Sequence, residues 1–252
     1  MKNYHTHTTR CHHAMNTEEE YIQAAIQAGY SELGFSDHTP WHYNSSFRSR
    51  IRMDESELED YVNTLLDLRE KYKNQISIKI GLECEYFERY IPWLRETLKK
   101  YPIDYIILGN HYDESDEDGI YFGYPLTKQQ FTKYVDNCIK AMNTGLYSYI
   151  AHPDLACYDV EDPFYEQEMT RLCEEAKKHD MQLEFNLGGY REKRHYPNKK
   201  FFEIAKKVGN KVIIGTDAHA SCELLDQKSY QEAYNFLKSL DLEYSEDIRF
   251  LR

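Results

Sequence analysis

Ile76-Ser77-Ile78-Lys79-Ile80-Gly81-Leu82-Glu83 is the stretch that decides the fold of this chain. It is short and rich in β-branched residues, and it ends in a carboxylate. Runs of this kind are typical of buried strands in a parallel sheet. An amphipathic segment, 54–73, precedes the stretch, and a second helical segment, 93–100, follows it. The stretch therefore predicts a strand in a chain where strands and helices alternate.

The same alternation extends toward both ends of the sequence. Besides 76–82, the predicted strands are 2–5, 32–36, 103–108, 147–151, 182–186 and 212–215. The predicted helices are 17–29, 54–73, 93–100, 128–144, 163–179, 198–208 and 224–240. Thr17 and Glu20 form a capping-box pattern at the start of the first helix, and Gly29 ends it. Seven strands, each followed by a helix, predict an α/β fold with a closed or nearly closed (β/α)7 barrel; a doubly wound open sheet is the alternative.

The composition narrows the class of protein. The chain has 252 residues, which suits a single domain over 1–252. Its 31 basic and 43 acidic residues give a formal charge of −12, so we expect neither nucleic acid nor anionic membrane as a partner. The six cysteines are scattered without a C-x-x-C pair, which favours a reducing compartment. With no signal-peptide pattern and no apolar run long enough to span a membrane, we expect a cytoplasmic protein.

Histidines and acids stand where the predicted strands end. The residues at these exits are His5, His7, His38, Glu83, His111, His152, Asp217 and His219, and His13 lies in the first loop. Because the carboxyl ends of parallel strands open on one face of a barrel, we expect these side chains to converge on a single mouth. Residues two apart on a strand point the same way, which pairs His5 with His7 and Asp217 with His219.

This set of residues predicts a metal site. Neutral imidazoles with two or more carboxylates are ligands of Zn, Mn or Fe rather than of Mg or Ca. Nine candidate ligands exceed the four that one tetrahedral ion needs, so we expect two or three divalent ions, with Glu83 placed to bridge two of them. Ions about 3.5–4 Å apart activate water and stabilise both oxygens of an in-line displacement at phosphorus.

The remaining histidines are assigned no metal role, because a single histidine is more often structural than a ligand. They are His12, His42, His179 and His195. The metal prediction therefore rests on the joint pattern at the strand exits and not on any one residue. Glu85, two residues after Glu83, is expected to be solvated or to support a ligand from behind.

Seven short motifs follow one another along the chain. They are His5-Thr6-His7-Thr8, Cys11-His12-His13, Ser36-Asp37-His38-Thr39-Pro40, Gly81-Leu82-Glu83, Leu108-Gly109-Asn110-His111-Tyr112, Ala151-His152-Pro153 and Gly215-Thr216-Asp217-Ala218-His219. Together they resemble the PHP (polymerase and histidinol phosphatase) superfamily, and most of all its histidinol-phosphatase branch. The resemblance covers nearly the whole chain. It implies a distorted (β/α)7 TIM-like barrel and a metal-dependent phosphatase that acts on L-histidinol phosphate in histidine biosynthesis.

Carried over motif by motif, the resemblance implies three metal ions. His5, His7, Glu83 and Asp217 would hold the first, His13, His38 and His219 the second, and Glu83, His111 and His152 the third. Members of the branch often read Cys-Pro-His-Gly where this chain has Cys11-His12-His13-Ala14. Spacing favours His13 over His12 as the ligand.

Residues 184–191, at the end of the sixth predicted strand, are similar to the family segment that reaches the substrate. A guanidinium group grips phosphate oxygens as a fork, so Arg191 is the first candidate for the phosphate contact and Arg194 the second. Asn186 would orient a ligand or the substrate. Weaker phosphate candidates follow His38 in the loop; they are Arg48, Arg50 and Arg52.

The chemistry expected of such a site is attack of an activated water on phosphorus. The ions and Arg191 would stabilise the developing charge. The proton for the histidinol alkoxide would come from metal-bound water, from Asp217 or from His219, and the sequence leaves these three open.

Three other functions stay open at this stage. A PHP phosphatase could act on another phosphomonoester, such as a phosphotyrosine or a nucleotide, although the net charge of −12 argues mildly against both. A non-catalytic metal-binding domain would be expected to have lost ligands, whereas each expected position is filled. An amidohydrolase-type barrel also begins with H-x-H, but Asp217-Ala218-His219 fits the PHP pattern better.

Overall fold

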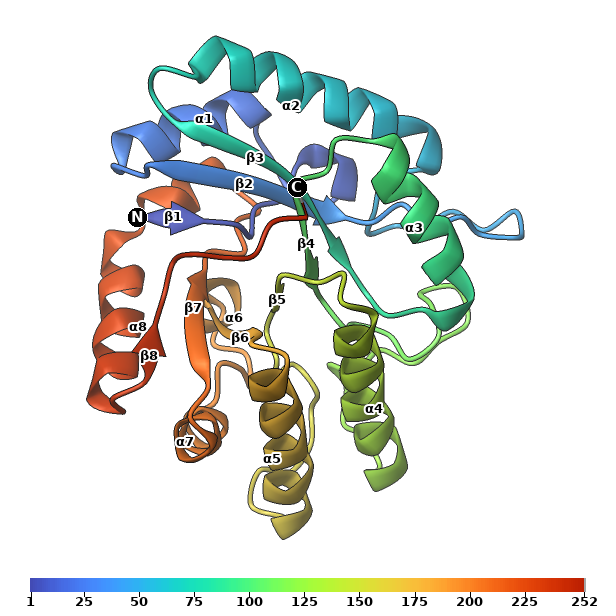
Figure 1. Cartoon of the computed structure of the whole chain (residues 1–252), viewed down its shortest axis with the longest axis vertical. Coiled ribbons are helices and arrows are strands. Elements are labelled where there is room, and N and C mark those ends of the chain that lie inside the picture. The colour runs from blue at the N-terminus through green and yellow to red at the C-terminus, as the bar shows by residue number, and fades with distance from the viewer. Residues whose placement is uncertain (252) are drawn as a thin grey trace.

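The computed structural model describes residues 1–251, and its strands form one curled parallel sheet (Figure 1). The strands are β1 (Lys2–Asn3), β2 (Glu32–His38), β3 (Ser77–Cys84), β4 (Tyr105–Leu108), β5 (Tyr149–Ile150), β6 (Gln182–Asn186), β7 (Lys211–Gly215) and β8 (Glu243–Tyr244). They lie across the sheet in chain order, and each strand is parallel to the next. The predicted α/β fold with a distorted TIM-like curl is confirmed.

Helices connect the strands and cover the outer face of the sheet (Figure 1). The α-helices are α1 (Glu18–Gln27), α2 (Leu58–Tyr72), α3 (Ile91–Lys100), α4 (Lys128–Thr144), α5 (Pro163–Lys178), α6 (Leu187–Arg191), α7 (Lys199–Val208) and α8 (Gln227–Ser239). Short 3-10 turns are η1 (Thr9–Cys11), η2 (Glu55–Glu57), η3 (Glu88–Tyr90) and η4 (Ser221–Leu225). Among the helices described, none combines the length and the hydropathy of a membrane span.

The helix ends follow from local hydrogen bonding. The predicted capping box is present in α1, where the Thr17 side chain accepts from the Glu20 backbone and the Glu20 carboxylate accepts from Thr17 N at 2.7 Å. Thr127 and Gln130 repeat the arrangement in α4. That helix stops at Gly145, whose φ of 69° lies in the left-handed region that glycine adopts without strain.

An eighth strand, which the sequence pattern does not predict, lies at the edge of the sheet. β8 pairs with Lys211 and Val212 of β7, and it is too short to show a hydrophobic period. Beyond the other end of β7, Thr6 forms a parallel bridge with Ala218, and His7 N donates to Ala218 O at 2.9 Å. The segments that follow the first and seventh strands therefore meet at the carboxyl rim of the sheet.

Two helical segments also differ from the prediction. Residues 187–191 form α6, because the Asn186 side chain accepts a hydrogen bond from Gly189 N at 2.7 Å and so starts a turn. The helix predicted over 224–240 is divided into η4 and α8. The second part restarts at Asp226, whose carboxylate accepts from Ser229 N at 3.0 Å.

The inside of the curled sheet has a small core of its own. Tyr105 and Ile107 of β4 point into it, while Ile106 and Leu108 join the larger core under the helices, so β4 is buried on both faces. A Cβ atom on Gly81 would lie 2.4 Å from the Tyr105 ring, which explains the glycine in β3. The other members of the inner core are Tyr4, Tyr149, Ala151 and Ile213, with Ile248 and Phe250 packed against them.

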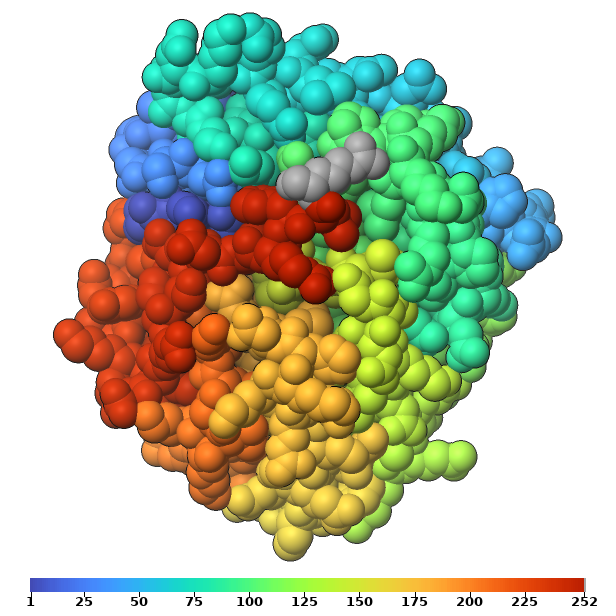
Figure 2. Space-filling model, viewed as in Figure 1, coloured from blue at the N-terminus to red at the C-terminus, as the bar shows by residue number. Residues whose placement is uncertain are grey.

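The segment after β8 covers the amino-terminal end of this inner core, and in Figure 2 it crosses the middle of the visible face. Leu251 N donates to Asp104 O at 2.7 Å, and Ser148 Oγ donates to Arg249 O at 2.6 Å, just before β4 and β5 begin. The Phe250 ring meets Tyr4 edge to face with 5.9 Å between the ring centres. The inner core is therefore covered at its base, and the functional groups gather at the opposite, carboxyl rim.

Candidate metal centre

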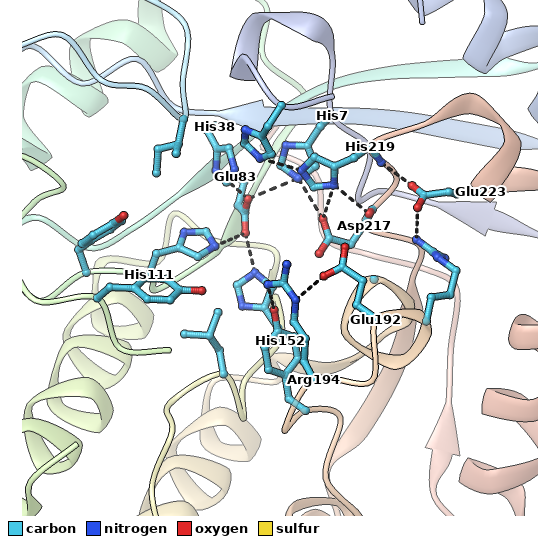
Figure 3. A pocket seen from close by; sticks show the side chains of 18 residues that line it. His7, His38, Glu83, His111, His152, Glu192, Arg194, Asp217, His219 and Glu223 are labelled. Carbon is cyan, nitrogen blue, oxygen red and sulfur yellow. Dashed lines mark hydrogen bonds and ion pairs between the residues drawn. The ribbon is translucent and has the colours of Figure 1, made fainter. Parts of the chain in front are cut away.

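The predicted ligands lie together at the carboxyl rim (Figure 3). In the parallel register His38 at the end of β2 stands beside Glu83 on β3. The ligand atoms of His5, His7 and Glu83 all lie within 4.8 Å of one another, as do those of His38, Glu83 and His111. Figure 3 shows His7, His38, Glu83, His111, His152, Asp217 and His219 turned toward one another around one cavity.

Glu83 lies at the centre of this cluster and is almost fully buried. Its Oε1 is 2.8 Å from His152 Nε2 and 3.4 Å from His111 Nε2. Its Oε2 is 3.0 Å from His38 Nδ1 and 3.6 Å from His7 Nε2. The two oxygens thus face different imidazoles, which is the arrangement that a bridging carboxylate requires.

Asp217 faces the other side of the cluster. Its Oδ1 lies 3.4 Å from His5 Nε2, 3.2 Å from His7 Nε2 and 3.5 Å from His219 Nδ1. The backbone φ of Asp217 is 50° and that of His152 is 30°. Non-glycine residues rarely adopt such angles, and they do so mainly at functional sites where the surroundings hold them.

His13 joins the cluster and His12 does not. His13 Nε2 lies 3.0 Å from His219 Nε2, and His13 lines the same cavity. His12 ends η1 with a φ of 66° and does not line the cavity. The spacing that favours His13 therefore agrees with the position of its ring.

The cluster fits divalent cations, because several of its buried polar atoms have no hydrogen-bond partner. They include His5 Nε2, His7 Nε2, His38 Nδ1 and Glu83 Oε2. Buried polar atoms are rarely left without a partner, and a bound cation would be a shared partner for the lone pairs of these atoms. Two ligands of one tetrahedral zinc ion, each about 2.0–2.1 Å from the metal, are about 3.3 Å apart. The 3.0–3.6 Å separations around Glu83 and Asp217 are of that size, apart from the 2.8 Å contact with His152.

Two further carboxylates hold the imidazoles from behind. Glu184 Oε1 accepts from His5 Nδ1 at 2.8 Å, and its other oxygen accepts from His152 N at 2.8 Å. Asp37 Oδ1 lies 3.5 Å from His7 Nδ1. Such contacts fix the tautomer and the ring orientation of a metal-binding histidine. Sequence reasoning assigned these two acids no role, although Glu184 is the second polar residue on the inner side of β6, two positions before Asn186.

Glu85 was predicted to be either solvated or a support behind a ligand, and the structure shows the second. It is fully buried, and its Oε1 lies 3.1 Å from His111 Nδ1. Burial alone would raise the pKa of Glu85, but Arg52 beside it lowers that pKa below its ordinary value. The residue is therefore an ionised hydrogen-bond acceptor at neutral pH.

The electrostatics keep several members of the cluster in the deprotonated form that binds cations. Burial lowers the pKa of His38 to about 4, and burial together with repulsion from His7 lowers the pKa of His219 to about 3. Burial would raise the pKa of Glu83, but His111, His38 and His5 hold it well below its ordinary value. Three imidazoles are exceptions, because nearby carboxylates outweigh their burial. The pKa of His7 rises to about 9, and the pKa values of His5 and His111 also lie above the ordinary value. A cation at His7 must displace that proton.

A cavity of about 320 Å³ opens beside the cluster. Residues that are not predicted ligands complete its wall, among them Ile51, Tyr112, Tyr121, Leu155, Arg191, Arg194 and Tyr196. Arg191 Nη2 donates to Thr216 O at 2.9 Å, while its Nε and Nη1 are buried without a partner. Arg194 Nε donates to Glu192 Oε2 at 2.6 Å. Both arginines predicted for the phosphate therefore line the cavity that the ligands face.

Asn186 lies behind the ligands and outside the wall of the cavity. Its Nδ2 donates to Glu184 Oε2 at 2.8 Å and to Asp217 Oδ2 at 3.2 Å. Of the two predicted roles, these contacts suit orientation of a ligand. They do not suit contact with a substrate.

The weaker arginine candidates lie away from the cavity. Arg48 and Arg50 are exposed on their loop. Arg52 is fully buried and forks onto Glu85, so its prediction as a phosphate contact is wrong. The histidines assigned no metal role also stay outside the cluster: Nδ1 of His42 pairs with Glu55, Nε2 of His179 lies near Glu175, and Nε2 of His195 lies near the Leu155 carbonyl.

Known proteins resemble this chain in sequence and in fold. The chain is 26% identical over 251 residues to the histidinol-phosphatase of Bacillus subtilis, a match that covers 85% of this chain and 92% of that protein. It is 26% identical over 243 residues to a Deinococcus radiodurans protein named "Probable histidinol-phosphatase", covering 87% and 86% of the two chains.

Among solved structures, a histidinol phosphate phosphatase from Lactococcus lactis matches with a TM-score of 0.77 and 18% identity, over 100% of this chain and 98% of that one. That protein was crystallised with zinc, L-histidinol and phosphate. The likeness supports the fold. The family model of the PHP domain matches residues 3–188, which is well over half of the sequence, and the chain therefore belongs to the PHP domain family.

Proposed function

We propose that this chain is a metal-dependent phosphatase that hydrolyses L-histidinol phosphate to L-histidinol and phosphate. The observation that carries the proposal is one cavity in which a cluster of imidazoles and carboxylates faces two arginines. The relatives named as histidinol-phosphatases support the choice of alcohol. The proposal treats residues 1–252 as a single PHP domain that acts in the cytoplasm.

We propose three cation sites within the cluster, held by the residues that the motifs imply. The first set is His5, His7, Glu83 and Asp217, the second is His13, His38 and His219, and the third is Glu83, His111 and His152. The contacts of Glu83 support its place in two sets, because its two oxygens face different imidazoles. When bound, Zn, Mn or Fe ions would neutralise the phosphate and lower the pKa of water.

Arg191 is the proposed phosphate-binding residue. Thr216 O accepts from one of its nitrogens, and Glu223 Oε1 lies 3.4 Å from the same nitrogen, so the side chain is held in place. Its remaining Nε and Nη1 are buried in the side of the cavity without a hydrogen-bond partner, and phosphate oxygens would supply one. Arg194, which is half exposed at the mouth, would add a second positive charge. The Tyr121, Leu155 and Tyr196 side chains give the alcohol an apolar wall.

Asp217 and His219 are the proposed catalytic residues for proton transfer. His5 and the other nearby imidazoles hold the pKa of Asp217 well below its ordinary value against the opposite effect of burial, so its carboxylate is ionised at neutral pH. An ionised carboxylate can accept a proton from the attacking water and return it to the leaving alkoxide. His219 is neutral at the same pH and can exchange a proton in the same way.

A substrate panel tests the proposal. Metal-replete protein is incubated with L-histidinol phosphate, phosphotyrosine, nucleoside monophosphates and p-nitrophenyl phosphate, and inorganic phosphate is measured before and after chelation. We expect histidinol phosphate to give the highest kcat/KM and chelation to abolish turnover. High turnover of another ester with none of histidinol phosphate would refute the substrate. Turnover that survives removal of all metal would refute the mechanism.

A further inference from the structure

Arg52 has a position that neither cation binding nor substrate binding explains. It belongs to the long loop between β2 and α2, where arginines are usually solvated, yet its side chain is fully buried. Its guanidinium donates to both oxygens of Glu85, from Nη1 at 3.0 Å and from Nη2 at 2.8 Å. Nη1 also donates to Thr39 O at 3.0 Å. A charged group buried so completely requires partners on every side, and Arg52 has them.

Glu85 connects Arg52 to the cluster. Its Oε1 accepts from Arg52 and lies 3.1 Å from His111 Nδ1, while its Oε2 accepts from Trp41 Nε1 at 2.9 Å. Both oxygens of Glu85 already accept hydrogen bonds from Arg52 and Trp41, so Glu85 meets His111 as an acceptor and the proton of a neutral His111 lies on Nδ1. The unprotonated Nε2 then faces Glu83 Oε1, 3.4 Å away. The tautomer of His111 thus depends on a carboxylate that Arg52 holds.

Arg52 also joins two loops that form the wall of the cavity. Its Nε donates to Asp116 Oδ2 at 3.1 Å. Asp116 belongs to the loop after β4, and it also accepts from the hydroxyls of Tyr43 and Ser49 on the loop of Arg52. His111 lies in the same loop as Asp116, so Arg52 fixes both the carboxylate behind His111 and the segment that carries it.

We propose that Arg52 is a positioning residue for the cation site at His111, acting through Glu85 to hold the His111 ring so that Nε2 faces Glu83. The inference rests on the proposed cation cluster. The four hydrogen bonds explain why an arginine is present, since a lysine ammonium cannot form a planar fork on Glu85 while donating to Asp116. Stability alone does not explain it, because well-packed apolar residues often replace buried ion pairs without loss.

The test compares cation affinities of folded, metal-free variants. Each protein is stripped of metal with a chelator and titrated with Zn²⁺ against a chromophoric competitor. The set consists of the wild type, Arg52→Met, Arg52→Lys, Glu85→Gln, His111→Asn and the Arg52→Met/His111→Asn double variant. Co²⁺ absorption spectra report the coordination of the bound ions, and circular dichroism confirms folding before each titration. Arg171→Met is the matched control, because Arg171 on α5 also joins two carboxylates, Asp136 and Glu168.

We expect Arg52→Met and Glu85→Gln to weaken one ion about 10–100-fold and to alter its Co²⁺ spectrum, as loss of a supporting contact to a metal-binding histidine does. Arg52→Lys should lie between Arg52→Met and the wild type. His111→Asn should weaken the same ion, and adding Arg52→Met to it should cost no further affinity. Arg171→Met should bind as the wild type does.

Distinct results overturn the inference and the proposed function. Wild-type affinity in Arg52→Met, or a further loss when it is added to His111→Asn, overturns the inference alone. Equal weakening of all ions also does so, because it indicates a general loss of structure. If Arg52→Met does not fold, the Zn²⁺ affinities of Arg52→Lys and Glu85→Gln are compared with that of the wild type instead. A wild-type protein that binds no ion overturns the proposed cation cluster and the inference together.

Discussion

A single added methyl group should disable the centre of the cluster. Gly109 follows β4 directly, and its φ is not in the left-handed region, so alanine meets no backbone penalty there. A Cβ atom at this position would lie 2.0 Å from Glu83 Oε1 and 2.5 Å from Glu83 Cδ. Real contacts of a Cβ are essentially never shorter than 3.0 Å, so the carboxylate must retreat by about 1 Å. Metal–ligand distances tolerate only about 0.2 Å, so Glu83 could no longer serve both of the cation sites proposed for it.

We therefore expect Gly109→Ala to lose at least about 100-fold in kcat/KM and at least about 10-fold in affinity for the ions at Glu83. The strain of overpacking should lower the free energy of unfolding by about 1–3 kcal/mol. Phosphate release, competitive Zn²⁺ titration and urea unfolding measure the three effects. Gly145→Ala is the control, because its positive φ strains the chain while nothing lies within 4 Å of the new Cβ. A Gly109→Ala protein that binds all ions with wild-type affinity would show that Glu83 is not a shared ligand.

Three further predictions test the phosphate contact, the protonation of the cluster and the inner core. Arg191→Met should lower kcat/KM about 10–100-fold and weaken inhibition by inorganic phosphate to the same extent, since a charged hydrogen bond contributes about 1.5–3 kcal/mol; unchanged phosphate inhibition would contradict the assignment. In the metal-free protein, the raised pKa of His7 contributes to the free energy of unfolding. This contribution is complete below about pH 6.5, the pKa of His7 in the unfolded chain, and it is lost as the pH rises through about 9. Cations must displace the same proton, so Zn²⁺ affinity should rise with pH up to about 9, and titrations that give a pH-independent affinity would refute this. Phe250→Ala should lower the free energy of unfolding by about 2 kcal/mol, which is less than for a fully buried phenylalanine. The variant should bind Zn²⁺ with wild-type affinity, which would show that the inner core does not determine cation binding at the cluster.

Much of the cluster could be predicted from the sequence, because residue types that bind metals stand at the ends of recognisable strands. His38 and Glu83 each stand at the end of a recognisable strand, and the parallel register places them side by side. The residues that support the ligands carry weaker signals. Glu184 is one acid in a buried strand, and its role becomes visible only when Gly215 on the neighbouring β7 is seen to leave space for its carboxylate.

Arg52 shows the limit of reading one sequence. Its loop is polar and carries two other arginines, Arg48 and Arg50, so Arg52 had the same weak phosphate prediction as its neighbours and no sign of burial. Its partners Glu85 and Asp116 are 33 and 64 residues away, and no periodicity connects them. The sequence pattern also did not predict α6, because its local residues do not favour a helix. Gly188 and Gly189 are poor helix formers, and only tertiary packing against Tyr196 explains a glycine at 189.

The bridge between Thr6 and Ala218 has a consequence for how the chain opens. The two residues lie 212 positions apart, and ligands of the proposed first site stand on both sides of the bridge. A cation shared by His5, His7 and Asp217 would act as a removable cross-link between remote parts of the polypeptide. Saturation at about 100 times the dissociation constant would add about 2.7 kcal/mol to the cost of separating them. Amide hydrogen exchange at β1 and at residues 216–219 should therefore slow together when Zn²⁺ is added.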